Sequence, residues 1–132
     1  MTQKDFNYSS IPVKDIMKKT LIFVDPETTA FQIAKLMKEG GISEVFVKEK
    51  KNFVGIITDR DFAIKIEVNK LPFDTPAKKI MSSPIITIDQ NQTISVAAKM
   101  MVDRKIRKLA VSDNDKIVGR LGSLDLVKQL AK

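Results

Sequence analysis

The segment Gly55-Ile-Ile-Thr-Asp-Arg-Asp61 combines residue types that could hold a phosphorylated sugar. An apolar strand here leads into the start of a helix, where free N–H groups and a partial positive charge attract anions. Glycine allows close approach to the backbone, and the Asp61 carboxylate can accept hydrogen bonds from the vicinal hydroxyls of a ribose. An explanation without a ligand stays open, because Thr58 and Asp61 have the spacing of a helix capping box.

A second group, Arg104-Lys-Ile-Arg-Lys108, could bind phosphate through charge-assisted hydrogen bonds. Cations at a helix end also stabilise the negative C-terminal dipole, which is a purely structural alternative. The corresponding stretch in the first half of the chain, Gly40-Gly-Ile-Ser-Glu44, contains no cation. The fold therefore does not require cations at this place, and both explanations remain.

The residue types that are missing exclude several chemistries. The 132 residues include no histidine and no cysteine, so a Ser-His or Cys-His pair, a disulfide scaffold and thiolate chemistry are ruled out. No catalytic constellation or metal-ligand cluster is visible, so we expect a protein that is not an enzyme and has no metal or covalent cofactor. An enzyme using Asp59 or Asp61 as its base is the alternative.

The positive charge is concentrated in one half of the chain. The net charge is +7, with 11 Lys/Arg against 10 Asp/Glu in residues 1–68 and 12 against 6 in residues 69–132. A basic half indicates an anionic partner, either a nucleotide, a nucleic acid or an acidic protein. A solvated lysine-rich surface is the simpler alternative. Aromatic residues that could stack on bases are few, which argues against a nucleic-acid-binding protein.

The segments Gly55–Asp61 and Arg104–Lys108 belong to a unit of sixty-four residues that occurs twice in the chain without a gap. Asp25–Met37 aligns with Asp89–Met101, and Phe53–Asp61 aligns with Ile117–Asp125. Hydrophobic periodicity predicts the order β-α-β-β-α for each copy, preceded by a short amphipathic stretch. The expected strands are residues 21–24, 45–47 and 53–57, then 85–88, 109–111 and 117–121; the last helices are residues 59–68 and 123–131; the amphipathic stretches are residues 13–17 and 77–81.

We therefore expect an α+β fold with two tandem units, residues 11–68 and 77–132, joined by a linker of residues 69–76. The two sheets should pack face to face with pseudo-two-fold symmetry, since one unit alone cannot cover its apolar side. Residues 1–10 are expected to be a loose tail. The first helix of each unit should begin at Thr29 or Thr93, with Gln32 completing a capping box at Thr29. Its predicted buried face comprises Phe31, Ile33, Ala34 and Met37, matched by Ile94, Ala97, Ala98 and Met101.

The repeat, the element order and three motifs together resemble a known family. Each copy opens with a pattern such as Asp15-Ile-Met17 or Lys79-Ile-Met81-Ser-Ser-Pro84, and the first carries Gly-h-h-Thr/Ser-x-x-Asp, where h is apolar. Residues 11–131 resemble a pair of cystathionine-β-synthase (CBS) domains, also called a Bateman module. The resemblance implies a regulatory module that binds AMP, ADP, ATP or S-adenosylmethionine in clefts between the two units and forms disc-shaped dimers.

The resemblance also implies ligand-binding residues by position. Asp61 would bind the ribose hydroxyls, Thr58 the ribose or phosphate, and Ile56 would line the base pocket. The full expected set is Ile56, Thr58, Arg60, Asp61, Ile85, Ile86, Arg107 and Lys108, the last two reaching the phosphates. A second site would use Leu21, Ile22, Ser43, Arg120 and Asp125, but there Gly122 replaces the Thr/Ser of the motif, Arg120 replaces an apolar residue and Glu44 replaces a cation.

The sequence thus predicts a cytoplasmic regulatory protein that senses an adenine nucleotide and signals to a partner protein. An S-adenosylmethionine-binding module and a basic nucleic-acid-binding protein are the alternatives. No apolar run approaches the roughly 20 residues of a membrane span. A homodimer is expected, because the last helix of each unit carries apolar positions at Phe62, Ile66, Leu126 and Leu130.

Overall fold

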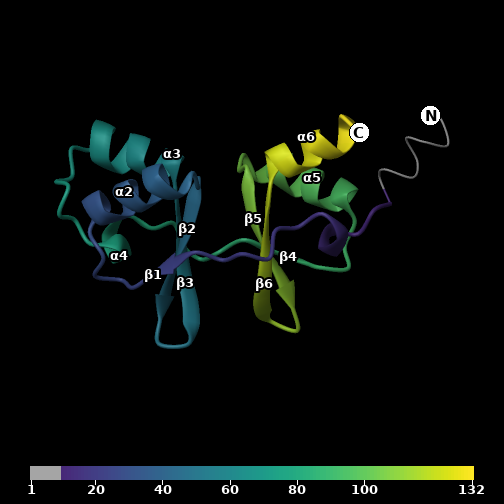
Figure 1. Ribbon diagram of the computed structural model, residues 1–132, viewed down its shortest axis with the longest axis horizontal. Helices are drawn as coiled ribbons and strands as arrows, with labels where there is room; N and C mark the ends of the chain where they lie inside the picture. The colour runs from purple at the N-terminus through teal and green to yellow at the C-terminus, as the bar shows by residue number, and fades with distance from the viewer. Residues whose placement is uncertain (1–9) are drawn as a thin grey trace. The chain divides into compact units, whose positions relative to one another are not determined.

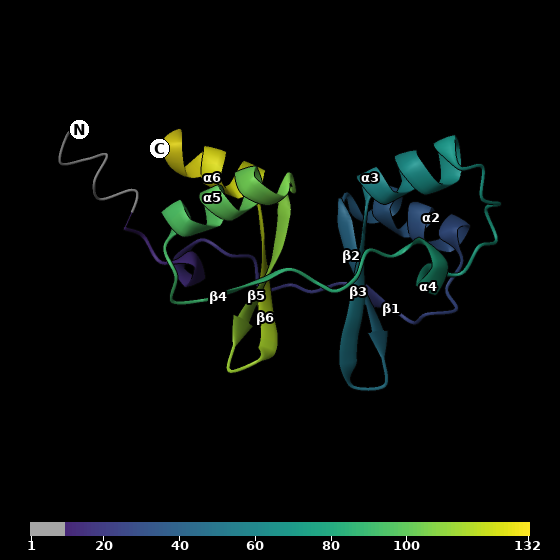
Figure 2. The same cartoon turned by 180° about the vertical axis from the view of Figure 1, so that it is seen from behind.

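The protein consists of two compact units in a computed structural model that describes residues 10–132. One unit is Leu21–Ile85, and the other combines residues 10–20 with Ile86–Lys132. Each unit has a three-stranded sheet with helices over one face (Figures 1 and 2), which confirms the predicted α+β fold class. The predicted N-terminal tail, apart from Ser10, lies outside the described residues.

The unit Leu21–Ile85 contains the sheet β1-β2-β3, in which β1 is parallel to β2 and β2 is antiparallel to β3. The chain enters a π-helix directly after the short helix α3, so the predicted last helix has two parts. The elements are β1 (Phe23–Val24), α2 (Ala30–Gly40), β2 (Glu44–Glu49), β3 (Asn52–Thr58), α3 (Asp59–Asp61), the π-helix η2 (Phe62–Val68) and α4 (Ala77–Ile80).

The other unit repeats this topology with the sheet β4-β5-β6. Its last helix is a regular α-helix, in contrast to the π-helix of the first unit. The elements are the 3-10 helix η1 (Val13–Asp15), β4 (Thr87–Asp89), α5 (Ile94–Arg104), β5 (Lys108–Asp113), β6 (Lys116–Gly122) and α6 (Ser123–Leu130).

The short amphipathic stretch that opens each sequence repeat packs on the other copy. The amide of Val13 donates to the carbonyl of Gln92 at 2.7 Å, and Val13 is fully buried in the core of the unit that contains β4, β5 and β6. In the same way, the amide of Ala77 donates to the carbonyl of Thr28 at 2.8 Å within the unit Leu21–Ile85. The boundaries of the compact units therefore differ from those of the sequence repeats.

The buried stripe of α2 differs from the one expected. Ala30 and Ile33 are fully buried, whereas Phe31 is 62% exposed and Ala34 is also exposed. The prediction was wrong at Phe31 and Ala34. It matched Phe31 with Ile94, but Ile94, the first buried residue of α5, aligns with Ala30 in the repeat. The helix start itself is as predicted: Thr29 and Gln32 form a reciprocal capping box, with bonds of 3.0 and 3.2 Å.

The apolar positions predicted for the dimer interface also need correction. Ile66 is buried in the core, and Phe62 and Leu126 pack against the cores of their units; only Leu130, at 71% exposure, lies open. The prediction was wrong at Phe62, Ile66 and Leu126 because these residues form the core-facing side of the last helices. The exposed large apolar residues on these helices are Ile64, Val68, Leu124, Val127 and the predicted Leu130.

Candidate functional site

The strand-to-helix junction at the end of β3 holds the predicted ribose-binding motif. Gly55 lies in β3 next to the point where the segment at Met81 and Ser82, the crossing segment, passes over this strand. Ile56 and Ser82 exchange two backbone hydrogen bonds of 3.0 and 2.8 Å there. A Cβ atom on Gly55 would clash with the side chain of Met81. The close approach that glycine permits here is therefore used by the protein's own chain.

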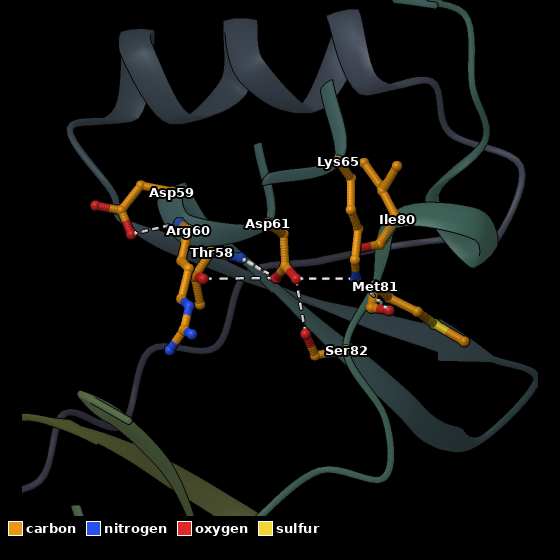
Figure 3. A network of polar contacts seen from close by, with 8 residues as sticks. All are labelled: Thr58, Asp59, Arg60, Asp61, Lys65, Ile80, Met81 and Ser82. Atoms are coloured by element: carbon orange, nitrogen blue, oxygen red, sulfur yellow. Dashed lines mark hydrogen bonds and ion pairs between the residues drawn. The ribbon is translucent and has the colours of Figure 1, made fainter. Parts of the chain in front are cut away.

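The Asp61 carboxylate is buried at this junction and accepts hydrogen bonds on both oxygens (Figure 3). Oδ2 accepts from the backbone N–H of Thr58 at 2.9 Å and from the Thr58 hydroxyl at 3.5 Å. Oδ1 accepts from the Ser82 hydroxyl at 2.7 Å and from Lys65 Nζ at 3.0 Å. The backbone bond fixes the start of α3, and the other oxygen ties that helix start to the crossing segment.

Lys65 was not among the residues expected at the site, yet its ammonium joins three parts of the unit. Besides Asp61, it donates to the carbonyl of Ile80 at 2.7 Å and to that of Met81 at 3.1 Å. The Lys65 side chain is 27% exposed and that of Asp61 only 8%. The available signal in the sequence was the i,i+4 spacing of Asp61 and Lys65, which places two residues of a helix side by side.

The remaining predicted residues of this unit lie around the same end of the sheet or in the segments leading to it. Glu44, at the start of β2, is the cross-strand neighbour of Thr58 and is buried, and its carboxylate accepts a 2.6 Å bond from the Ser43 hydroxyl. Leu21 and Ile22 lead into β1 and are half-buried, as is Ile85 at the end of the unit. Ile56 in β3 is half-buried and Arg60 in α3 is exposed.

The other predicted residues belong to the second unit, where Asp125 occupies the place of Asp61. Asp125 Oδ2 accepts from the backbone N–H of Gly122 at 2.7 Å, and Oδ1 lies 3.7 Å from Lys18 Nζ. Arg120 Nε donates to the carbonyl of Thr20 at 2.8 Å. Lys18, which the sequence interpretation missed, reaches Asp125 because its backbone bonds to Arg120 in β6.

Lys108 lies at the start of β5, opposite Gly122 in the ladder, with its Nζ beside the glycine. Arg107 precedes it, is exposed, and accepts a backbone bond from the Ser123 N–H at 2.9 Å. Ile86, which leads into β4, is half-buried. The expected ligand set thus draws on both compact units, with Ile86, Arg107 and Lys108 in one and the Asp61 group in the other.

Three further observations concern the described residues more widely. Among residues 10–132, no group of three or more acidic, histidine or cysteine side chains could hold a metal ion. No helix in that range is long and apolar enough to span a membrane. The pKa of Lys78, on α4, is raised because its ammonium donates a 2.6 Å hydrogen bond to the negatively charged Glu27 carboxylate.

Comparison with known proteins identifies relatives of the whole repeat. The family model described as CBS domain matches twice, over residues 13–67 and 77–132. An uncharacterized protein from Methanopyrus kandleri is 39% identical over 122 residues, which are 90% of this chain but 62% of the relative. The CBS domain-containing protein YhcV from Bacillus subtilis is 30% identical over 86% of this chain and 81% of its own length.

Solved structures share the same architecture. The crystal structure of an uncharacterized conserved protein from Pyrococcus horikoshii matches with a TM-score of 0.90 and 28% identity, covering 94% of this chain and 95% of that one. A crystal structure described as CBS domain NE2398 matches with a TM-score of 0.81 and 30% identity, over 86% and 90% of the two chains. The predicted tandem fold therefore has direct structural counterparts.

Proposed function

Because the chain belongs to the CBS-domain family as two units in tandem, we propose that it is a regulatory module that binds an adenosine phosphate at Asp61 and signals to a partner protein. CBS pairs generally bind ligands and regulate partners. The ligand is AMP, ADP or ATP, and the partner is a separate protein whose activity follows ligand occupancy.

One observation carries this proposal. The motif Gly55–Asp61 forms a strand that ends at a helix start, and the Asp61 carboxylate is held there by the N–H of Thr58. A carboxylate in this setting can accept hydrogen bonds from ribose hydroxyls, while the helix start attracts phosphate. The proposed adenosine ligand supplies both kinds of group.

The test is a calorimetric titration with AMP, ADP, ATP and S-adenosylmethionine. Asp61→Ala should remove most nucleotide binding, because a lost hydrogen bond to a charged acceptor is worth roughly 1.5–3 kcal/mol. Asp125→Ala, the equivalent change in the other unit, is the matched control, and circular dichroism checks that both variants fold. Nucleotide affinity that survives in Asp61→Ala would overturn the proposal, and binding of S-adenosylmethionine alone would favour the alternative ligand.

The role of Arg107 and Lys108 in phosphate binding remains a prediction that can be tested by charge. If these cations contact the phosphates, Arg107→Glu should weaken the binding of ATP more than that of adenosine, since only ATP carries negative groups that form charge-assisted hydrogen bonds. Glu44→Arg should then create or strengthen phosphate-dependent binding at a second site, because it replaces a repulsive carboxylate. Equal effects of Arg107→Glu on ATP and adenosine would show that Arg107 does not meet the phosphates.

We also propose that the protein forms a homodimer through the exposed apolar residues of α5 and α6. Val102 on α5 is 75% exposed, and Leu124, Val127 and Leu130 follow one another at intervals of three residues on α6. Exposed apolar clusters of this kind usually mark an interface. Light scattering at micromolar concentration should report twice the 14.8 kDa of one chain, and Val127→Glu should reduce it to one chain. A wild-type protein that is wholly monomeric would contradict the proposal.

A further inference from the structure

The hydrogen-bonding capacity of the Asp61 carboxylate is fully used within its own unit. A carboxylate offers about four lone-pair sites, and Asp61 receives four hydrogen-bond donors, two on each oxygen. A ligand hydroxyl can therefore bond to Asp61 only by replacing one of these donors. Which donor leaves decides which ligands the site accepts.

Two of the four donors are firmly held. The N–H of Thr58 belongs to the backbone and fixes the start of α3. Lys65 uses its ammonium hydrogens on Asp61, Ile80 and Met81, so its departure would break three bonds and leave a poorly exposed carboxylate without a cation. Removing one partner of a buried ion pair is strongly unfavourable.

The other two donors are hydroxyls, one on each carboxylate oxygen. The Thr58 hydroxyl is at 3.5 Å from Oδ2, the longest of the four distances, and the Ser82 hydroxyl is at 2.7 Å from Oδ1. Ser82 is an exposed residue, and a hydroxyl can turn to another partner without moving the backbone. Figure 3 shows the two hydroxyls approaching Asp61 from different elements, β3 and the crossing segment.

We propose that Lys65 and Ser82 set the specificity of the Asp61 site by allowing only an exchange of hydroxyl for hydroxyl. Two vicinal hydroxyls of the ligand replace those of Thr58 and Ser82, while Lys65 stays and keeps the carboxylate charged and in position. This inference rests on the proposed nucleotide binding at Asp61. Ser82 is then an internal competitor of the ligand, and Lys65 is a positioning residue.

The first arm of the test measures competition. Ser82→Ala removes the competing hydroxyl, so AMP should bind about three- to tenfold more tightly, the range expected for one modest hydrogen bond. The gain should be smaller for 2′-deoxy-AMP, which has a single ribose hydroxyl to exchange. Ser83→Ala is the matched control, since Ser83 is the exposed neighbour and should leave both affinities unchanged.

The second arm measures positioning. Lys65→Met keeps most of the length of the side chain but removes the cation, and AMP should bind at least about tenfold more weakly because Asp61 loses its charge-assisted partner. Lys38→Met, an exposed lysine on α2, makes the same change of net charge as a control. A purely structural network would weaken binding in both Ser82→Ala and Lys65→Met, so weaker AMP binding in Ser82→Ala would overturn the proposal.

A measurement without ligand separates this inference from the proposed function. Amide hydrogen exchange at Ile56 and Ser82, whose backbones bond to each other, should accelerate in Lys65→Met and not in Lys38→Met. Unchanged exchange in Lys65→Met would overturn the positioning role of Lys65. Faster exchange combined with no binding of any adenosine phosphate by the wild-type protein would instead overturn the proposed function, and the hydroxyl exchange with it.

Discussion

The two units hold equivalent carboxylates with lysines that come from different elements. Asp61 pairs with Lys65, which lies one turn further along the same helical segment, at 3.0 Å. Asp125 pairs with Lys18, which lies on the segment that crosses β6 at Arg120, at 3.7 Å. Lys18 stands sixty-four residues before Ser82 and so occupies the equivalent place in the repeat. Each unit therefore keeps a cation beside its carboxylate, although the position that supplies it has changed.

The change of position alters how well the carboxylate is held. Lys65 is 27% exposed and bonds two backbone carbonyls in addition to Asp61, whereas Lys18 is 49% exposed in its pair with Asp125. Charges in solvent attract each other less than buried charges do. Asp61 is therefore held by more hydrogen bonds than Asp125, and by a less exposed lysine.

The largest expected effect is on the stability contributed by these two carboxylates. Asp61→Asn should lower the free energy of unfolding by roughly 2–4 kcal/mol, because it breaks a poorly exposed ion pair and its hydrogen bonds. Loss of the ion pair in Asp125→Asn should lower the free energy of unfolding by about 1 kcal/mol or less, because Lys18 is half-exposed. Urea denaturation of both variants measures the difference. Equal losses would mean that the location of the lysine does not matter.

The second prediction concerns a feature that the two units share. A Cβ on Gly55 would clash with Met81, and one on Gly119 would lie 2.6 Å from Met17 Sδ and 3.0 Å from the carbonyl oxygen of Lys18. Alanine at either glycine should destabilise the protein by about 1–3 kcal/mol, as overpacking does. Thermal unfolding of Gly55→Ala and Gly119→Ala measures both losses.

A second substitution, at the methionine beside each glycine, distinguishes the surroundings of Gly55 from those of Gly119. Met81→Ala should recover part of the stability lost in Gly55→Ala, since all three nearest atoms belong to the Met81 side chain. Met17→Ala should recover less in Gly119→Ala, because the backbone carbonyl of Lys18 remains in the way. Equal recovery in the two double variants would contradict this account of the crossings.

The sequence predicted the fold class and the repeated order of elements because hydrophobic periodicity and the sixty-four-residue repeat are local signals. It also located the capping partners at Thr29 and the bond between Thr58 and Asp61. It did not predict that each opening stretch packs on the other copy, since nothing in the local pattern indicates which sheet a short helix will cover. The exposure of Phe31 was missed for a related reason: an aromatic residue at helical spacing fits either of two adjacent stripes.

Within the candidate site, the sequence identified Asp61 but not the residues that saturate it. Ser82 reaches Asp61 through a crossing of segments 21 residues apart, which no motif records. Lys65 was detectable by its helical spacing, but an i,i+4 ion pair is common on solvent-exposed helices and does not by itself mark a site. What remained hidden was the tertiary packing that brings the carbonyls of Ile80 and Met81 to the same ammonium.

The smallest expected effect concerns the pair of residues that face each other at one end of the β2-β3 and β5-β6 pairings, because this pair differs between the two units. Glu44 faces Thr58 in one unit, whereas Lys108 faces Gly122 in the other. A Cβ on Gly122 would lie 3.1 Å from Lys108 Nζ, so the glycine leaves room for the ammonium. Glycine is needed here for space and not for backbone freedom, since Gly122 has an extended conformation that any residue adopts.

Gly122→Thr alone should therefore destabilise the protein by about 1 kcal/mol, since the flexible lysine can move aside at a modest loss of contact. Combining it with Lys108→Glu gives this ladder end the residue types of the other unit. Because neighbouring residues are coupled, the double variant should lose about 0.5–1 kcal/mol less stability than the two single changes add up to. A double-mutant cycle of urea unfolding measures this coupling, with Glu44→Lys and Thr58→Gly as the reverse exchange. Strict additivity in both cycles would mean that the two ladder ends diverged independently, and that Gly122 has its identity for a reason other than the lysine beside it.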